Sequence, residues 1–211
     1  MATPPSLIDL DVIARATVFR DPYTYLVANN FLRPEAVGSL RQDFPLITKP
    51  GFLTVDDVVL SGRFKQLIEE LEGPELTELL SNKFGRDLKP HPRLTTVRKF
   101  SQLKDGRIHT DGESKLATFL VYMNDEWSDD RAGRLRVLRG PADFDDMAAE
   151  ISPVMGSAFG FLRSDNSWHG HKPFAGERRV VQVTWLRDAA DLQRKKSRNT
   201  AAKFLKGIFG R

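Results

Sequence analysis

The feature that most constrains the fold is a set of metal-ligand residues split between two distant segments. His109 and Asp111 are separated by one residue, and His169 and His171 follow about sixty residues later. On a β-strand, residues i and i+2 point to the same face, so His109 and Asp111 can bind one ion together. A third ligand from a distant strand would complete two imidazoles and one carboxylate, an arrangement that leaves open positions on non-heme Fe(II). The pattern therefore predicts a fold in which two distant strands meet at one point.

His169 is the best candidate for the third ligand. The chain has four histidines, and His91 lies between two prolines in a predicted loop. In an extended strand, His171 would point to the same face as His169. Three roles therefore remain open for it: metal ligand, substrate contact or packing residue. A single HxD motif is a hypothesis until its structural context agrees with it.

The context is a succession of short strands. Turn signals such as Lys104-Asp105-Gly106 and Asn124-Asp125 separate apolar or alternating segments. We expect one strand to carry His109 and Asp111, and further strands at 94–100, 116–123, 133–138, 157–162 and 180–185. So many short strands indicate a barrel or a double-sheet jelly roll, which is a mainly β fold with some α-helix.

Helices are predicted before this β region. Apolar residues recur at helical spacing in 34–44, 64–71 and 74–84, and such stripes usually pack against a core. We therefore divide the chain into an N-terminal helical support region (1–90), a β core (91–188) and a basic C-terminal tail (189–211).

Several motifs resemble the iron(II)- and 2-oxoglutarate-dependent dioxygenases, specifically their prolyl-4-hydroxylase-like branch. The resemblance covers roughly residues 94–187. Its carriers, in order, are His-Thr-Asp at 109–111, Leu-Val-Tyr-Met-Asn at 120–124, Ala-Gly-Arg-Leu at 132–135, Ser-Trp-His at 167–169, Gly-Glu-Arg-Arg at 176–179, and Trp185.

The resemblance implies a double-stranded β-helix, or jelly roll, whose catalytic Fe(II) is bound by His109, Asp111 and His169. It also implies 2-oxoglutarate as cosubstrate, O2 as oxidant and ascorbate as an addition in assays. The expected reaction hydroxylates a C–H bond of a peptidyl-prolyl or small-molecule substrate and releases succinate and CO2. Two alternatives stay open: a cupin-like metal isomerase or epimerase, and a binding module without turnover.

The far carboxylate of 2-oxoglutarate needs a cation, and a guanidinium matches a carboxylate with two parallel hydrogen bonds. The family's Gly-x-Arg habit points to Arg178. Strand alternation instead places Arg179 on one face with Val181, Val183 and Trp185, which we interpret as the barrel interior, so the register favours Arg179. A β-bulge after Gly176 would reverse this choice. Tyr122 matches the family position whose hydroxyl often shares the carboxylate, and the alternative is a strand aromatic with its hydroxyl at the rim.

The charge of the chain is concentrated at its C-terminal end. The net charge is +4 overall and +6 from Arg187 onward, so residues 1–186 carry −2. Phe204, Leu205, Ile208 and Phe209 form one stripe of a predicted amphipathic helix. We expect this helix to dock on its own domain or a partner subunit, with an anionic membrane surface as the second possibility and an acidic partner as the third. The sequence leaves the oligomeric state open.

The remaining observations narrow the class of partner and the compartment. The chain has no cysteine and no secretory signal, so we expect a cytoplasmic protein. Nucleic acid is disfavoured as a substrate, because the second arginine of the related nucleic-acid demethylases is absent where Thr184 and Trp185 stand. Acidic side chains in 124–133 and 141–150 are candidate pocket rims that would favour a cationic or neutral substrate. The alternative, which we favour, is that both stretches are solvated loops without a recognition role.

Overall fold

A computed structural model of the protein describes residues 4–128 and 132–194, in which ten strands form two antiparallel sheets. The larger sheet has the order β1-β2-β8-β5-β10-β4-β3, and the smaller has the order β7-β6-β9. The strands are β1 (Val18–Phe19), β2 (Tyr25–Ala28), β3 (Leu53–Thr54), β4 (Arg93–Ser101), β5 (Lys115–Tyr122), β6 (Leu135–Leu138), β7 (Met147–Ile151), β8 (Ala158–Leu162), β9 (His169–Gly170) and β10 (Gly176–Leu186). This is the predicted mainly β jelly-roll architecture with supporting helices.

Residues 189–194, at the end of the described chain, are helical, and the other α-helices lie in its N-terminal part. They are α1 (Leu10–Arg15), α2 (Pro34–Gln42), α3 (Gly62–Leu71) and α4 (Pro74–Phe84), with 3-10 turns η1 (Val55–Asp57) and η2 (Leu103–Asp105). Proline begins α2 and α4, where its missing N–H is not needed. The predicted helical segments are confirmed, each within two residues at its ends, and 64–71 and 74–84, predicted as one or two helices, are two.

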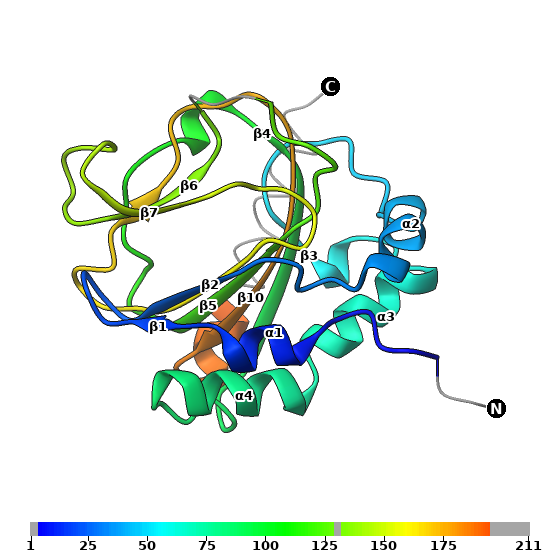
Figure 1. Ribbon diagram of the computed structural model, residues 1–211. Helices are drawn as coiled ribbons and strands as arrows, with labels where there is room; N and C mark the ends of the chain where they lie inside the picture. The colour runs from blue at the N-terminus through cyan, green and yellow to red at the C-terminus, as the bar shows by residue number, and fades with distance from the viewer. Residues whose placement is uncertain (1–3, 129–131, 195–211) are drawn as a thin grey trace.

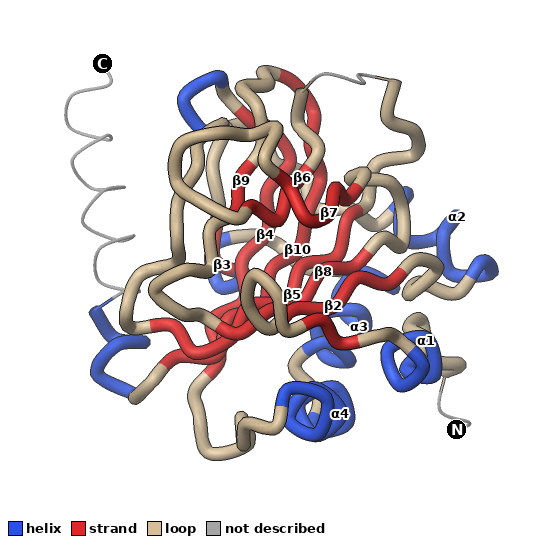
Figure 2. Tube along the Cα trace, turned by 60° about the vertical axis from the view of Figure 1, so that its left-hand side comes forward, coloured by secondary structure: helices blue, strands red, loops and turns tan. Residues whose placement is uncertain are grey.

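The larger sheet buries both of its faces. Figures 1 and 2 show α1, α3 and α4 on one side of it and β6 and β7 on the other. On the helix side, Val181, Val183 and Trp185 of β10 pack with the apolar residues of α2, α3 and α4. On the other side, residues such as Tyr122 and Val180 pack against the smaller sheet. The space between the two sheets is therefore lined by the β10 face opposite to the one we predicted.

Three parts of the chain differ from the expected layout or lie beyond it. The region 1–90 supplies β1, β2 and β3 to the larger sheet in addition to its helices. The stretch 141–150, predicted as a rim loop, contains most of β7. The predicted C-terminal amphipathic helix falls outside the described residues. Within the described ranges, no helix has the length and apolar character needed to span a bilayer.

Candidate active site

The two predicted metal-binding segments meet at a single point. His109 and His169 exchange both backbone hydrogen bonds, N to O at 2.9 Å in each direction. The prediction of a regular strand carrying His109 and Asp111 is wrong, because that segment pairs with β9 through this one bridge. Gly170 makes the close approach possible, since a Cβ there would lie 2.1 Å from the carbonyl oxygen of Arg107.

The structure brings His109, Asp111 and His169 together, with one ligand atom from each lying within 4.8 Å of the others. Nδ1 of His109 lies 3.2 Å from the Arg107 carbonyl, and Nδ1 of His169 lies 2.8 Å from the Ser167 carbonyl. Because a carbonyl only accepts, each Nδ1 carries a proton and each Nε2 keeps its lone pair for a metal.

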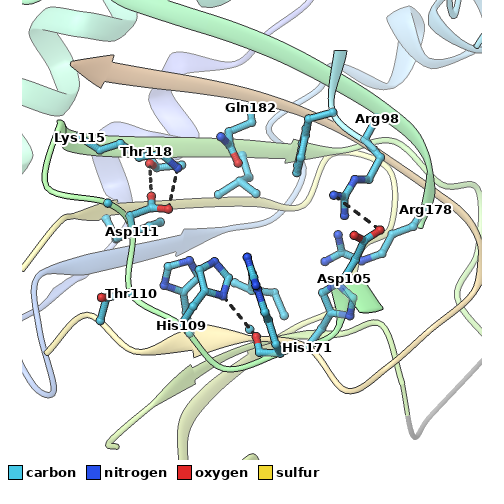
Figure 3. Close-up of a pocket in the computed structure, with 18 of the residues that line it drawn as sticks. Arg98, Asp105, His109, Thr110, Asp111, Lys115, Thr118, His171, Arg178 and Gln182 are labelled. Carbon is cyan, nitrogen blue, oxygen red and sulfur yellow. Dashed lines mark hydrogen bonds and ion pairs between the residues drawn. The ribbon is translucent and has the colours of Figure 1, made fainter. Parts of the chain in front are cut away.

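The Asp111 carboxylate is held from both oxygens. Nζ of Lys115 donates to Oδ1 at 2.6 Å, and the hydroxyl of Thr118 donates to Oδ2 at 2.8 Å. Both partners come from β5, the strand that follows this segment (Figure 3). They hold the carboxylate in place beside the two imidazoles. Neither residue was singled out in the sequence, where nothing marks a threonine or lysine near a strand start as a partner of Asp111.

The protonation states suit metal binding at neutral pH. Burial lowers the pKa of His169 to about 4, although the Asp111 carboxylate acts in the opposite direction. Burial also lowers the pKa of His109. For Asp111, burial acts to raise the pKa, but the charges of Lys115 and His169 and two hydrogen bonds lower it to about 2. Two neutral imidazoles and one carboxylate are therefore present at pH 7.

The cluster opens into a cavity of about 650 Å³ between the sheets. Figure 3 shows Asp111, Lys115 and Thr118 toward one end and Arg98, Asp105, His171 and Arg178 toward the other. His171 lines the cavity but is not part of the ligand cluster. Burial and the charge of Arg178 lower its pKa to about 3, so it is a neutral wall residue near the cationic end.

Arg178 lies in this cavity, and only 3% of its surface is exposed. Its Nε donates to the Gly133 carbonyl at 2.8 Å, and its Nη2 donates to the Tyr122 hydroxyl at 3.2 Å. Tyr122 itself is fully buried, so its hydroxyl does not lie at a solvent-exposed rim. The guanidinium thus lines the cavity at the end remote from Asp111, and the phenol lies behind it as a hydrogen-bond partner that does not itself line the cavity.

Arg179 lies elsewhere, contrary to the register argument. Its guanidinium stacks 5.3 Å from the ring centroid of Phe44 and pairs with Glu177, and it does not line the cavity. The alternation along β10 was predicted correctly, but the face with Val181, Val183 and Trp185 packs against the helices and not toward the cavity. A sheet buried on both faces gives two apolar sides, and the pattern of one strand does not tell which of them is the barrel interior.

The described acidic residues of the two candidate rims do not line the cavity. Asp145 and Glu150 pair with Arg136, and Asp125 pairs with Arg41. The charged residues that line the cavity are mostly cationic: Arg98, Lys104, Arg107, Lys115 and Arg178 against Asp105 and Asp111. Of the two alternatives for these stretches, the pocket rim is therefore not supported by their described residues, and the favoured alternative was not a recognition role.

A comparison with known protein families finds one family model that matches this chain. The model of the 2OG-Fe(II) oxygenase superfamily matches residues 96–187, which confirms the resemblance drawn from the motifs. The matched segment contains the His-Asp-His cluster, Tyr122 and Arg178. No curated protein matches the chain.

Solved structures with a similar fold include three prolyl hydroxylases. A Pseudomonas putida prolyl-4-hydroxylase is 17% identical with a TM-score of 0.55, over 85% of this chain and 97% of that protein. One from Phytophthora capsici is also 17% identical, with a TM-score of 0.54, over 85% of this chain but 63% of that protein. A Trichoplax adhaerens prolyl hydroxylase, in complex with a hypoxia-inducible-factor peptide fragment, is 20% identical with a TM-score of 0.51, over 77% and 83%. At these identities the likeness shows a shared fold.

Proposed function

We propose that this protein, whose residues 96–187 are those of a 2OG-Fe(II) oxygenase, hydroxylates a C–H bond of a peptidyl-prolyl or small-molecule substrate. The observation that carries the proposal is one cavity with a His-Asp-His cluster and, toward its other end, a buried arginine. Such a cavity suits a ligand that chelates a metal and carries a second carboxylate.

The residues present fit iron(II). Two imidazoles and one carboxylate on one side of a metal are the ligand set of non-heme Fe(II) oxygenases, and they leave positions for other ligands. His109 and His169 offer Nε2 atoms whose lone pairs are free, and Asp111 offers an ionised carboxylate. The ring centroids of the two histidines lie 4.5 Å apart, close enough to share one ion.

The residues also fit 2-oxoglutarate. We assign Arg178 as the anchor of its far carboxylate, because Arg178 is buried in the cavity while Arg179 is outside it. Tyr122 lies within hydrogen-bonding distance of the Arg178 guanidinium and can donate its proton to the same carboxylate. Burial raises the pKa of Tyr122, so its hydroxyl keeps its proton at neutral pH.

When bound, iron and 2-oxoglutarate supply the oxidation: O2 and 2-oxoglutarate are converted to succinate and CO2, and the substrate C–H becomes C–OH. The protein's own residues bind and orient these groups. Lys115 and Thr118 fix the metal-binding carboxylate, and Gly133 fixes the guanidinium of Arg178. Apolar side chains such as Leu120, Leu135 and Phe161 line the same cavity and limit the water in it.

The substrate class rests on similarity of fold. A peptidyl-prolyl substrate is supported by the prolyl hydroxylases among the similar structures, one of which holds a peptide. A small molecule is the alternative within the same chemistry. The cationic lining of the cavity gives no reason to prefer a cationic substrate.

The test is an anaerobic titration of the Fe(II)-loaded protein with 2-oxoglutarate, followed by visible absorption spectroscopy. We expect the weak charge-transfer band of a metal-chelated keto acid, and its loss in His109→Ala. Absence of the band in folded, iron-loaded protein would favour a cupin-like metal isomerase. A band without succinate formation, with or without any substrate, would favour a binding module.

A further inference from the structure

A second buried arginine lines the cavity near Arg178. Arg98 lies on β4, where it is the register partner of Val180 on β10, and 8% of its surface is exposed. Figure 3 shows its guanidinium close to Arg178, Asp105 and His171, at the end of the cavity remote from Asp111. No sequence motif marks this residue.

Arg98 lacks the partners that a buried guanidinium requires. Its Nε is buried and has no hydrogen-bond partner. Its ion pair with Asp105 is long, at 3.8 Å, and Oδ2 of Asp105 also accepts a hydrogen bond from the Gln102 backbone at 2.9 Å. A buried charge with incomplete pairing costs stability unless another group completes it.

The position of Arg98 is nevertheless well defined. Its guanidinium carbon lies 4.0 Å from the ring centroid of Phe52, a cation–π contact that covers one face of the group. Phe52 also lines the cavity. The N–H groups at the edge of the guanidinium therefore stay available in the plane where a carboxylate can accept them.

The charges at this end of the cavity do not balance. Burial lowers the pKa of Arg98 to about 10, Asp105 partly opposes this effect, and the charge of Arg178 adds to it. The Tyr122 phenol supplies no negative charge, because burial raises its pKa. This end of the cavity therefore holds two guanidiniums, Arg98 and Arg178, and one carboxylate, Asp105, which pairs with Arg98.

We propose that Arg98 is the second arm of the cosubstrate anchor: its free N–H groups bind the far carboxylate of 2-oxoglutarate together with Arg178. This inference rests on the proposed function and adds a residue to it. The far carboxylate of 2-oxoglutarate supplies a negative charge at this end of the cavity and accepts hydrogen bonds from both arginines. Arg98 accordingly makes the cavity select keto acids that carry a second carboxylate.

The experiment uses two ligands of the same chain length. One is 2-oxoglutarate, and the other is 2-oxopentanoate, which has a methyl group in place of the far carboxylate. Each is titrated calorimetrically, without oxygen, into Mn(II)-loaded protein. We compare the wild type with Arg98→Met, with Arg98→Lys, and with Lys99→Met, which removes a charge from the next residue of β4, one that does not line the cavity.

We expect Arg98→Met to raise the Kd of 2-oxoglutarate about 10- to 50-fold, as loss of charge-assisted hydrogen bonds does. The Kd of 2-oxopentanoate and of Mn(II) should change less than about twofold by the same reasoning. Arg98→Lys should recover part of the affinity, and Lys99→Met should resemble the wild type. Thermal unfolding of each variant checks that it is folded.

Two results would overturn the assignment of Arg98. An unchanged Kd for 2-oxoglutarate would show that Arg178 suffices, and an equal loss for both keto acids would show that Arg98 only shapes the cavity. Failure of the wild type to bind 2-oxoglutarate at all would overturn the proposed function and the assignment with it. The wild-type titration thus tests the function, and the ratio between ligands tests Arg98.

Discussion

The two ends of the cavity are built in different ways. At the metal end, His109 and His169 are fixed by two backbone hydrogen bonds, and Asp111 has a partner on each oxygen. At the anchor end, Arg98 and Arg178 reach in from β4 and β10 on long side chains. Protein atoms hold the side chains of the first end in place, whereas at the second end the buried Nε of Arg98 has no hydrogen-bond partner.

This difference indicates which side chains of the site are already positioned before ligands bind. Backbone pairing places the metal ligands close to binding geometry, so metal binding should need little rearrangement. We propose that the anchor end gains its last hydrogen bonds from the cosubstrate. Changes at the metal end should therefore remove metal binding, and changes at the anchor end should weaken 2-oxoglutarate while leaving the metal in place.

Asp111→Ala should have the largest effect. Removing the only carboxylate of the cluster should lower metal affinity strongly and turnover at least about 1,000-fold, because all of the oxidation depends on the metal. Turnover is measured as succinate formation and metal affinity by calorimetry. The fold should persist, since the sheets close without the ion. Global unfolding of the variant would instead show that the metal site is structural. It would contradict the proposed difference between the two ends of the cavity.

Arg178→Ala should come next, with an increase of roughly 100-fold in the Kd of 2-oxoglutarate and little change in metal affinity. Arg179→Ala is the matched control, because it removes the same charge one residue away and outside the cavity. Calorimetric titration of the metal-loaded variants measures both constants. If Arg179→Ala gives the larger loss, the register favoured by the sequence was right and the assignment from the cavity is wrong.

The metal end was the more predictable one. Its three residues were named from the sequence because a metal needs particular residue types at particular spacings. Such spacings can be recognised in the sequence alone. The strand around His109 was nevertheless wrong, since residues 107–111 pair with β9 only at one bridge. An extended segment held at one point has the same sequence pattern as a full strand.

The anchor end was less predictable for a physical reason. Arg178 and Arg179 are adjacent, and the choice between them depends on which face of β10 looks inward. That face is decided by the helices that cover the sheet, a long-range property. Arg98 was not predicted at all, because the sequence around an arginine in a strand does not show whether its side chain lines a cavity.

Gly170→Ala tests whether backbone pairing organises the metal end. The new Cβ would lie 2.1 Å from the carbonyl oxygen of Arg107, so the segments bearing His109 and His169 would have to separate. We expect metal affinity to fall by about 10-fold, with the relative binding of keto acids unchanged. Gly140→Ala is the control, since its Cβ would meet nothing within 4 Å. Equal metal affinities in the two variants would show that side chains alone set the site.

Tyr122→Phe should have the smallest effect and sharpens the picture of the anchor end. The ring is fully buried and stays in place, so only the hydroxyl that meets Arg178 is lost. One neutral hydrogen bond contributes about 0.5–1.5 kcal/mol, which corresponds to roughly a 2- to 12-fold rise in the Kd of 2-oxoglutarate. Binding of 2-oxopentanoate should not change, because this ligand has no far carboxylate for the hydroxyl to meet. If both ligands bind as they do to the wild type, Tyr122 is a packing residue and the anchor consists of guanidinium groups alone.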